Sequence, residues 1–586
     1  MNNRLKSVLT VFETHRAVLE RGVFPVVLFL YPFIGMFQGI DLTDTAYSLG
    51  NYRFMERLDP MWVIATYLPH VTGRLIQHLP YGNTMAGCNA YCTLFICATG
   101  LCAYALLARF VPAWIGFAGT LLAESLFWCP RAILYNTMTY FLFTAGTLLL
   151  LHAVTNETET KWPFLLAGIC FGLNVTVRLP NIVHTVMIVI VFVYGHMENR
   201  GILTVCKQVI LCVCGFFAGF LVPFLAICIR YGSYAYSEMI ISLFGMSETA
   251  REYSLGGMLL SVANAYAKTL GHMAILVPCM AAGVAMFTIK KDKWTNWKKA
   301  AYVAGLLILG RYYLAQGVFT FNYWYYDCMF QAAMMFLIVS CILFVSDLLN
   351  LFHGSSQERI LSLAALVSVL ILPIGSNNYT FPVINCLFVI APASLACFLR
   401  ARRAAYETTI APQQFVWVSA VTGIVLVLLV QGALFHFRFS FRDGMDGTVR
   451  DTRITEIPKL NGMVTTAENA DRLTALYTFF RESGYEGRET LLFGDIPGIS
   501  YLFDLPPAIF TTWPDLESNV TERFDEALSA LSDPPLVIVQ PEGAGTYTHS
   551  ERKYTLLLFY MEQNGYETVY DANGLKVFAV PEGADG

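Results

Sequence analysis

The sequence is short of charge and, in its C-terminal part, of cysteine. Asp, Glu, Lys and Arg make up only 14% of the 586 residues, whereas hydrophobic residues make up 56%. Ordinary soluble proteins contain about 25% charged residues, so this composition excludes a wholly soluble protein. All fifteen cysteines lie between Cys88 and Cys397, so no disulfide can brace the residues that follow. None forms a CxxC pair, and most lie in apolar runs, where a thiol behaves as a small hydrophobe.

The few charges are also unevenly distributed. Residues 437–586 hold 24 acidic and 12 basic residues, whereas residues 1–436 hold 18 acidic and 26 basic residues. We therefore expect a transmembrane domain at 1–436 and a soluble α/β domain at 437–586. Because the hydrophilic part is acidic and would repel a phosphate backbone, nucleic acid is not an expected partner.

Long apolar runs without charges recur through residues 1–436. A helix of about 20 such residues crosses a bilayer, so the runs predict a polytopic α-helical membrane protein with about 13 transmembrane helices. The first run starts at Phe24, after four basic residues, and lacks a small-residue cleavage site, which indicates an uncleaved signal anchor. The predicted spans are 24–40, 85–108, 110–130, 132–154, 163–177, 180–195, 208–229, 269–289, 300–315, 328–346, 360–375, 383–399 and 414–436.

Orientation follows from the short loops that hold Lys and Arg, because positive loops stay in the cytoplasm. Their alternation, clearest in the lysine cluster between Lys290 and Lys299, predicts a cytoplasmic N-terminus in the plasma membrane. An odd number of spans then places residues 437–586 outside. On that side, loops 41–84 and 230–268 are long enough to carry function, and we expect amphipathic helices in both.

Within residues 437–586, strand-like and helix-like runs alternate, which is typical of a layered parallel sheet. The pair Asn573-Gly574 between the last two runs is a strong hairpin signal. No Walker A loop and no GxGxxG follows a strand, so a nucleotide site has no support. The predicted strands are 490–493, 536–539, 567–570 and 575–580, and the predicted helices are 468–481, 516–531 and 551–563.

Two carboxylates, Asp41 and Asp44, directly follow the first predicted span. A partly buried carboxylate at this place can accept the proton of an attacking hydroxyl, because burial raises its basicity. Either residue alone is equally well explained as a solvated loop start or a helix N-cap.

Three arginines at outer ends of predicted spans, Arg131, Arg178 and Arg311, break the positive-inside pattern. A guanidinium pairs with phosphate through two hydrogen bonds, so together they suit a phosphate group at the membrane surface. Taken singly, each is more simply explained by snorkelling towards lipid headgroups.

Aromatic residues crowd the outer ends of the ninth and tenth predicted spans, among them Tyr323, Trp324 and Tyr326. Rings at this depth usually form an interfacial belt, and the alternative is a stacking platform for a sugar or an isoprenoid. The histidines near the outer side have no HExxH or other ligand spacing, so a histidine metal site is not expected.

The order of these features resembles the GT-C superfamily of polyprenyl-phosphate-dependent glycosyltransferases, especially the family of protein O-mannosyltransferases and lipid A aminoarabinose transferases. Asp44-Thr45-Ala46-Tyr47 is similar to the family's first-loop motif, with Thr45 in place of Glu. Arg131 and Asn136 are similar to an Arg followed five residues on by an acid, with an amide at the acidic position. Arg178-Leu179-Pro180 is similar to the basic residue and Pro after the fifth span.

The resemblance extends over nearly the whole chain, since residues 491–502 and 534–539 look like the exported α/β domain of bacterial members. It implies an inverting glycosyltransferase that moves a hexosyl or pentosyl group from a polyprenyl-phosphate donor to an acceptor hydroxyl on the outer face. The implied partners are this lipid-linked donor, membrane lipid and an unknown envelope acceptor. A divalent metal, Mg or Mn, stays open, with Glu124 as the residue that would replace the missing charge.

The resemblance also implies roles for single residues. Asp44, or Asp41 as its deputy, would deprotonate the acceptor hydroxyl. The three arginines would stabilise the charge that grows on the leaving phosphate. The expected substrate-binding residues are Tyr47, Asn136, Tyr323, Trp324 and Tyr326.

Two other classes of function stay open. A glycolipid transporter or flippase would move its substrate without chemistry, although transporter halves often repeat and bind near the bilayer midplane, and neither sign is evident. A catalytically silent relative that anchors an envelope-assembly partner is kept open by the departures at Thr45 and Asn136.

Overall fold

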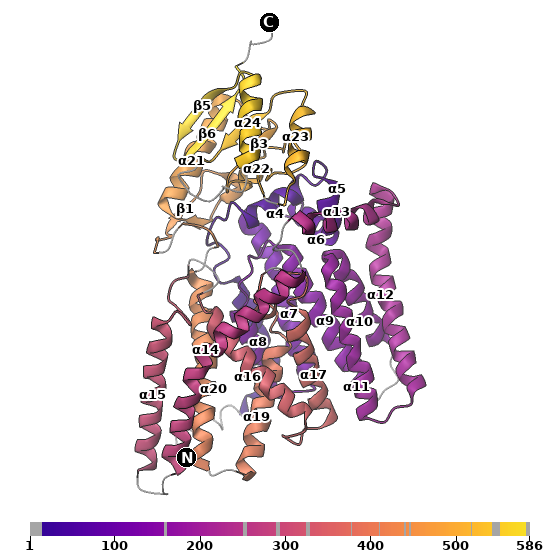
Figure 1. Cartoon of the computed structure of the whole chain (residues 1–586), viewed down its shortest axis with the longest axis vertical. Coiled ribbons are helices and arrows are strands. Elements are labelled where there is room, and N and C mark those ends of the chain that lie inside the picture. The colour runs from indigo at the N-terminus through magenta and orange to yellow at the C-terminus, as the bar shows by residue number, and fades with distance from the viewer. Residues whose placement is uncertain are drawn as a thin grey trace.

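The computed structural model is elongated, with a bundle of long helices at one end, a small sheet domain at the other and short helices between them (Figure 1). This arrangement is the predicted fold class, a polytopic helical protein with a C-terminal α/β domain. The residues that the structure describes are 14–156, 161–249, 255–288, 294–323, 328–376, 378–408, 411–438, 441–444, 447–516, 518–541 and 551–581.

The first helical segment begins and ends earlier than the predicted span at 24–40. Its consecutive parts are α2 (Arg16–Val18), the π-helical η1 (Leu19–Val23), α3 (Phe24–Leu30) and the 3-10 helix η2 (Tyr31–Phe33). Gly35 has a φ of +73°, a left-handed conformation that ends helices readily in glycine. Residues 34–43 therefore form an irregular link between the first helix and Asp44.

Helices stand at each of the other twelve predicted places. They are α7 (Met85–Leu107), α8 (Ala113–Ser125), α9 (Leu134–Thr155), α10 (Trp162–Val177), η3 and α11 (Leu179–Ile188, Val189–Met197), α12 (Ile202–Tyr231), α14 (Leu255–Thr288), α15 (Thr295–Ala315), α16 (Phe330–Leu348), α17 (Ser356–Ile371), α18 and α19 (Phe381–Ile384, Ile390–Thr408), and α20 (Ala411–Arg438).

Seven helical segments among the described residues are long and apolar enough to cross a membrane. The chain is therefore a multi-pass membrane protein, although the count of thirteen spans is not confirmed, because several of the remaining helices are shorter. The seven segments are Met85–Leu107, Leu134–Thr155, Leu179–Met197, Ile202–Tyr231, Gly256–Thr288, Phe330–Leu348 and Gln413–Arg438.

Glycines bring α10 and α12 into backbone contact. A Cβ added at Gly168 would lie 2.0 Å from Cys212 O, and one added at Gly172 would lie 2.0 Å from Phe216 O. Small residues four positions apart allow this close approach in membrane helices. The packing fixes the end of α10, from which Arg178 follows.

Both long loops that the sequence analysis assigned to the outer side contain helices. The first contains α4 (Asp44–Arg53), α5 (Pro60–Ala65) and α6 (Tyr67–Gln77), and the second contains α13 (Ala235–Thr249). These helices lie between the bundle and the sheet domain (Figure 1). Helix α4 packs closely on α6, because a Cβ at Gly73 would lie 2.3 Å from the Tyr52 ring.

The sheet domain is mixed, which corrects the prediction of a parallel sheet. Its four-stranded sheet has the order β3-β4-β6-β5, in which β3 and β4 are parallel and β6 is antiparallel to both of its neighbours. Asn573 and Gly574, with φ of 52° and 72°, reverse the chain between β5 and β6. The strands are β3 (Thr490–Phe493), β4 (Leu536–Val539), β5 (Glu567–Ala572) and β6 (Leu575–Ala579), with a separate antiparallel pair β1 (Thr452–Arg453) and β2 (Val464–Thr465).

The helices of this domain are α21 (Ala467–Ser483), α22 (Gly498–Leu502), α23 (Thr521–Ser529) and α24 (Glu551–Gln563). Helix α23 begins five residues later than the predicted Leu516. Before it, the Asn519 side chain donates a hydrogen bond to Trp513 O at 2.7 Å, which holds a turn in place of the expected first helical turn.

The sheet domain docks onto α4 and the link before it. Gly498 N donates to Leu42 O at 2.8 Å, and Ile40 N donates to the buried Asp443 carboxylate at 2.9 Å. Arg53 of α4 pairs with Asp504 at 2.9 Å. The domain therefore covers the start of α4.

Candidate active site

Asp41 closes the turn that starts α4. It is 4% exposed, and its carboxylate accepts hydrogen bonds from Thr43 N at 2.9 Å and Thr45 N at 2.7 Å, and from the Thr43 hydroxyl. Burial raises the pKa of Asp41, and these hydrogen bonds oppose the rise. Both carboxylate oxygens are thus engaged in hydrogen bonds that close the turn before α4, whose N-cap residue is Thr43.

Asp44 is the first residue of α4 and is half-buried. No described residue donates a hydrogen bond to its carboxylate. Burial raises the pKa of Asp44 to about 6; the negative charges of Asp41 and Asp495 add to the rise, and the positive charge of Arg442 opposes it. A carboxylate with this pKa is mostly ionised at neutral pH and is a better proton acceptor than an exposed Asp.

The loop between α8 and α9 contains a cysteine that is influenced by the charges of both Asp44 and Arg178. Cys129 in this loop lies within electrostatic reach of both Asp44 and Arg178. Asn136, in the first turn of α9, donates from Nδ2 to Cys129 Sγ at 3.2 Å. Cys129 thus contacts Asn136 and is influenced by the charges of Asp44 and Arg178, three residues that the sequence singled out separately.

Arg178 follows the last residue of α10 and is half-buried. Its guanidinium lies 5.6 Å from the centre of the Tyr135 ring and donates one hydrogen bond to Gly375 O at 2.9 Å. A guanidinium has five N–H donors, so Arg178 keeps donors for an anionic group beside Asp44.

The sheet domain supplies site residues that the sequence analysis missed. Asp495, in the loop after β3, and Arg442, after α20, both act electrostatically on Asp44. Trp513 meets the ring of Tyr47 edge-on, with centroids 5.5 Å apart, so the predicted substrate-binding Tyr47 lies against this domain. The position of Asp495 directly after a predicted strand could have indicated a site residue, because ligand sites in α/β sheets tend to lie outside the carboxyl ends of parallel strands.

Polar atoms without partners gather at the same edge of the sheet. Gly494 N donates to Asp515 Oδ2 at 2.9 Å, whereas Asp515 Oδ1, Gln540 Oε1 and Thr512 Oγ1 are buried and have no hydrogen-bond partner. Burial raises the pKa of Asp515 to about 7. Buried polar atoms are normally satisfied, so this acceptor-rich edge suits a ligand that carries hydroxyl or amine donors.

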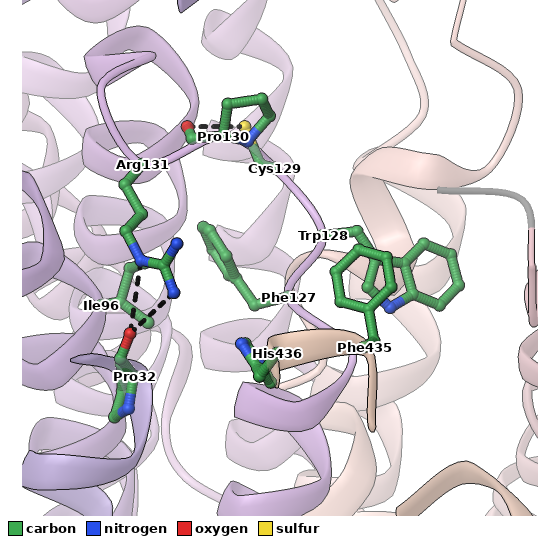
Figure 2. Close-up of a pocket in the computed structure, with 9 residues that line it drawn as sticks. All are labelled: Pro32, Ile96, Phe127, Trp128, Cys129, Pro130, Arg131, Phe435 and His436. Carbon is green, nitrogen blue, oxygen red and sulfur yellow. Dashed lines mark hydrogen bonds between the residues drawn. The ribbon is translucent and has the colours of Figure 1, made fainter. Parts of the chain in front are cut away.

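Arg131 does not turn towards Asp44. Its guanidinium donates to the backbone carbonyls of Pro32, at 3.1 and 3.3 Å, and of Ile34, at 2.5 Å. It lines a small cavity of about 40 Å³ with His436 and Phe127, which has room for about one water molecule (Figure 2). Arg131 thus ties the loop before α9 to the end of the first helix.

The remaining predicted residues lie elsewhere. Arg311 is exposed on α15, which packs on α14 and α20 at the margin of the bundle, apart from α4 (Figure 1). Tyr323 is buried and donates from its hydroxyl to Gln431 Oε1 at 2.5 Å. Trp324 and Tyr326 lie outside the described residues.

Glu124 does not form a metal site with its neighbours. It is 1% exposed at the end of α8, and neither carboxylate oxygen has a hydrogen-bond partner. Among the described residues, no group of three or more His, Cys, Asp or Glu side chains is placed to hold a metal ion. Mg²⁺ requires about six oxygen ligands, so this single carboxylate does not fit Mg or Mn.

Comparison with known proteins gives matches among solved structures alone: no family model and no curated protein matches the chain. The chain is similar to ArnT from Cupriavidus metallidurans bound to undecaprenyl phosphate, at 12% identity over 98% of this chain and 99% of that one, with a TM-score of 0.38.

It is also similar to the Archaeoglobus fulgidus oligosaccharyltransferase in the apo form, at 12% identity over 96% of this chain and 74% of that one, with a TM-score of 0.44. A third similar structure is the archaeal oligosaccharyltransferase AglB from the same organism, in complex with an inhibitory peptide and a dolichol-phosphate. Its identity to this chain is 13% over 97% of this chain and 75% of that one, with a TM-score of 0.42.

Proposed function

We propose that the chain is an inverting glycosyltransferase that moves a sugar from a polyprenyl-phosphate donor to an acceptor hydroxyl on the outer face of the plasma membrane. The observation that carries this proposal is that the charges of Asp44 and Arg178 both act on the same side chain, Cys129. A carboxylate with a pKa of about 6 and a half-buried guanidinium, both within electrostatic reach of Cys129, supply a base and a phosphate-binding group.

The reaction follows from these two groups. Asp44 accepts the proton of the acceptor hydroxyl as its oxygen forms a bond to the anomeric carbon. The bond from that carbon to the phosphate oxygen breaks, and Arg178 stabilises the negative charge that remains on the polyprenyl phosphate. Attack from the face opposite the phosphate inverts the anomeric centre.

The acceptor reaches Asp44 from the side of the sheet domain. Two interactions support this direction: Asp495 acts electrostatically on Asp44, and the Trp513 ring packs edge-on against Tyr47. The unpartnered oxygens of Thr512, Asp515 and Gln540 lie in the same part of that domain and suit the hydroxyl groups of an envelope glycan. In this scheme the sheet domain is outside the plasma membrane and the N-terminus is inside.

A comparison of cell-envelope glycans with and without the gene tests the proposal. We expect the deletion strain to lose one sugar from an envelope component and to accumulate the polyprenyl-phosphate-linked donor. Purified protein in vesicles, supplied with that donor, should form a new glycosidic bond. Movement of the glycolipid across the vesicle without a new bond would identify a flippase instead, and unaltered glycans together with a stable protein complex would identify an assembly protein.

A further inference from the structure

A pocket of about 420 Å³ lies where α20 ends and the chain enters the sheet domain. It is lined by parts of the chain that are far apart in sequence, including Gln38, Tyr323, Phe437, Arg438, Thr448 and Arg450. Its volume falls in the range of about 300–1,000 Å³ that is usual for small-molecule sites. None of the residues assigned to Asp44 catalysis lines it.

The charge of this pocket selects an anion. Two of its lining residues, Arg438 and Arg450, are basic, and none of the described lining residues is acidic. Arg450 donates from Nε to Asp443 O at 2.6 Å, whereas its buried Nη2 has no hydrogen-bond partner. The nearby Asp443 carboxylate is already bound by Ile40 N, Thr465 and Asn469. An unpartnered buried guanidinium donor is costly, so an anionic group beside it is stabilising.

The rim of the pocket selects an amphiphile. Phe321, Phe437 and Val449 are 59%, 58% and 69% exposed, and all three line the pocket. Phe437 lies in the last turn of the apolar segment Gln413–Arg438, where a membrane helix meets the headgroup layer. A ligand here places its charge against the arginines and its apolar part along these side chains.

We propose that this pocket binds the phosphate headgroup of a membrane phospholipid, at a site separate from Asp44 and Arg178. Bound lipid would link α20, the segment around Gln38 and the start of the sheet domain. The pocket thereby fastens the sheet domain to the bilayer surface. This inference does not depend on the glycosyltransferase proposal.

The test uses the full-length protein in detergent, with bound lipid counted by native mass spectrometry. The probes are phosphatidylglycerol, inorganic phosphate and undecaprenyl phosphate. We expect R438Q and R450Q each to weaken phosphatidylglycerol binding by about tenfold, or about 1.4 kcal/mol, because each variant loses a charge-assisted hydrogen bond to the phosphate. R450K should keep most of the binding, and R453Q, an exposed arginine on β1 outside the pocket, is the matched control.

Two comparisons identify the ligand. R178Q should leave phosphatidylglycerol binding unchanged, which separates the pocket from the candidate active site. Unchanged phosphatidylglycerol binding in both R438Q and R450Q overturns the proposal, provided that both variants keep the melting temperature of the wild type. Inorganic phosphate that competes as well as the lipid would identify a free-phosphate site, and binding confined to undecaprenyl phosphate would assign the pocket to the donor; either result contradicts a phospholipid site.

Discussion

Asp44 owes its basicity to its surroundings. Burial is the largest cause of its raised pKa, and the charges of Asp41, Asp495 and Arg442 then act in opposite directions. The ionised form is the proton acceptor, and it predominates above a pH of about 6. Activity that depends on Asp44 must therefore be present above this pH and decline below it.

We predict that sugar transfer is constant above a pH of about 6 and falls about tenfold per pH unit below it. Replacing Asp495 by Asn removes a negative charge, lowers the pKa of Asp44 and shifts the fall to lower pH. Replacing Arg442 by Gln removes a positive charge, raises the pKa of Asp44 and shifts the fall to higher pH. The measurement is kcat/KM against pH for the three proteins, and a profile that moves in neither variant would contradict this assignment.

The sequence analysis assigned Arg178 and Arg311 the same phosphate-binding role, but their surroundings in the structure differ. Arg178 shares the surroundings of Cys129 with Asp44, whereas Arg311 is exposed on α15. We predict that R178Q lowers kcat/KM about 100-fold or more, as does loss of one charge-stabilising donor in other enzymes. R311Q should change kcat/KM less than about twofold, as exposed substitutions away from a site do. Equal losses in both variants would place Arg311 at the site together with Arg178 and contradict the structure.

At the scale of elements, two carboxylates at the start of α4, Asp41 and Asp44, have different roles. Asp41 holds the first turn by hydrogen bonds to Thr43 and Thr45, and Asp44 faces the site without such bonds. Of the two candidate bases in the sequence, Asp41 therefore has a structural role, and Asp44 is the proposed base. Their substitutions should therefore behave differently.

We predict that D41N retains most of the transfer activity, because the Asn side-chain oxygen still accepts one of the two hydrogen bonds, from Thr43 N or from Thr45 N. D41A should lower the free energy of unfolding by about 0.5–2 kcal/mol through the loss of both hydrogen bonds. Thermal unfolding and kcat, measured on the same preparations, check both statements. A large loss of kcat in D41N with an unchanged melting temperature would make Asp41 a catalytic base.

Elements with a strong local pattern are the ones that the sequence predicts well. The predicted strands 490–493 and 536–539 coincide with β3 and β4, because short apolar runs with polar flanks define both ends of a buried strand. The end of the first span is different, since the apolar residues continue to Ile40 while the backbone leaves the helix near Gly35. Hydropathy cannot distinguish an apolar link from an apolar helix.

At the scale of the whole molecule, the candidate site is completed by docking of the sheet domain onto α4. Arg442, Asp495 and Trp513 reach the surroundings of Asp44 and Tyr47 only through that contact. They lie about 400 residues or more further along the chain, and no local pattern indicates such a contact. This is why the sequence predicted Asp44, Asn136 and Arg178 but missed the residues that the sheet domain supplies.

The docking has a tight point at Gly498. A Cβ added there would lie 2.3 Å from Ala46 Cβ and 2.6 Å from Leu42 O. We predict that G498A displaces the sheet domain, increases proteolysis between α20 and β1 and lowers transfer severalfold, and that A46G added to it restores part of the loss. Gly423 has open space where a Cβ would be added, so G423A is the matched control. Wild-type transfer by G498A would show that the domain contact does not shape the site.

The most direct test of the whole account is D44N, because Asn keeps the shape of the side chain and removes the proton acceptor. D525N, at an exposed carboxylate on α23, is the control for the loss of one negative charge. With full-length protein in vesicles and a polyprenyl-phosphate-linked sugar, D44N should lose at least about 100-fold of the transfer rate, within the range for loss of a general base. D525N should keep the wild-type rate, and both variants should insert and melt as the wild type does. Normal transfer by D44N would contradict the assignment of Asp44 as the base and, with it, the proposed mechanism.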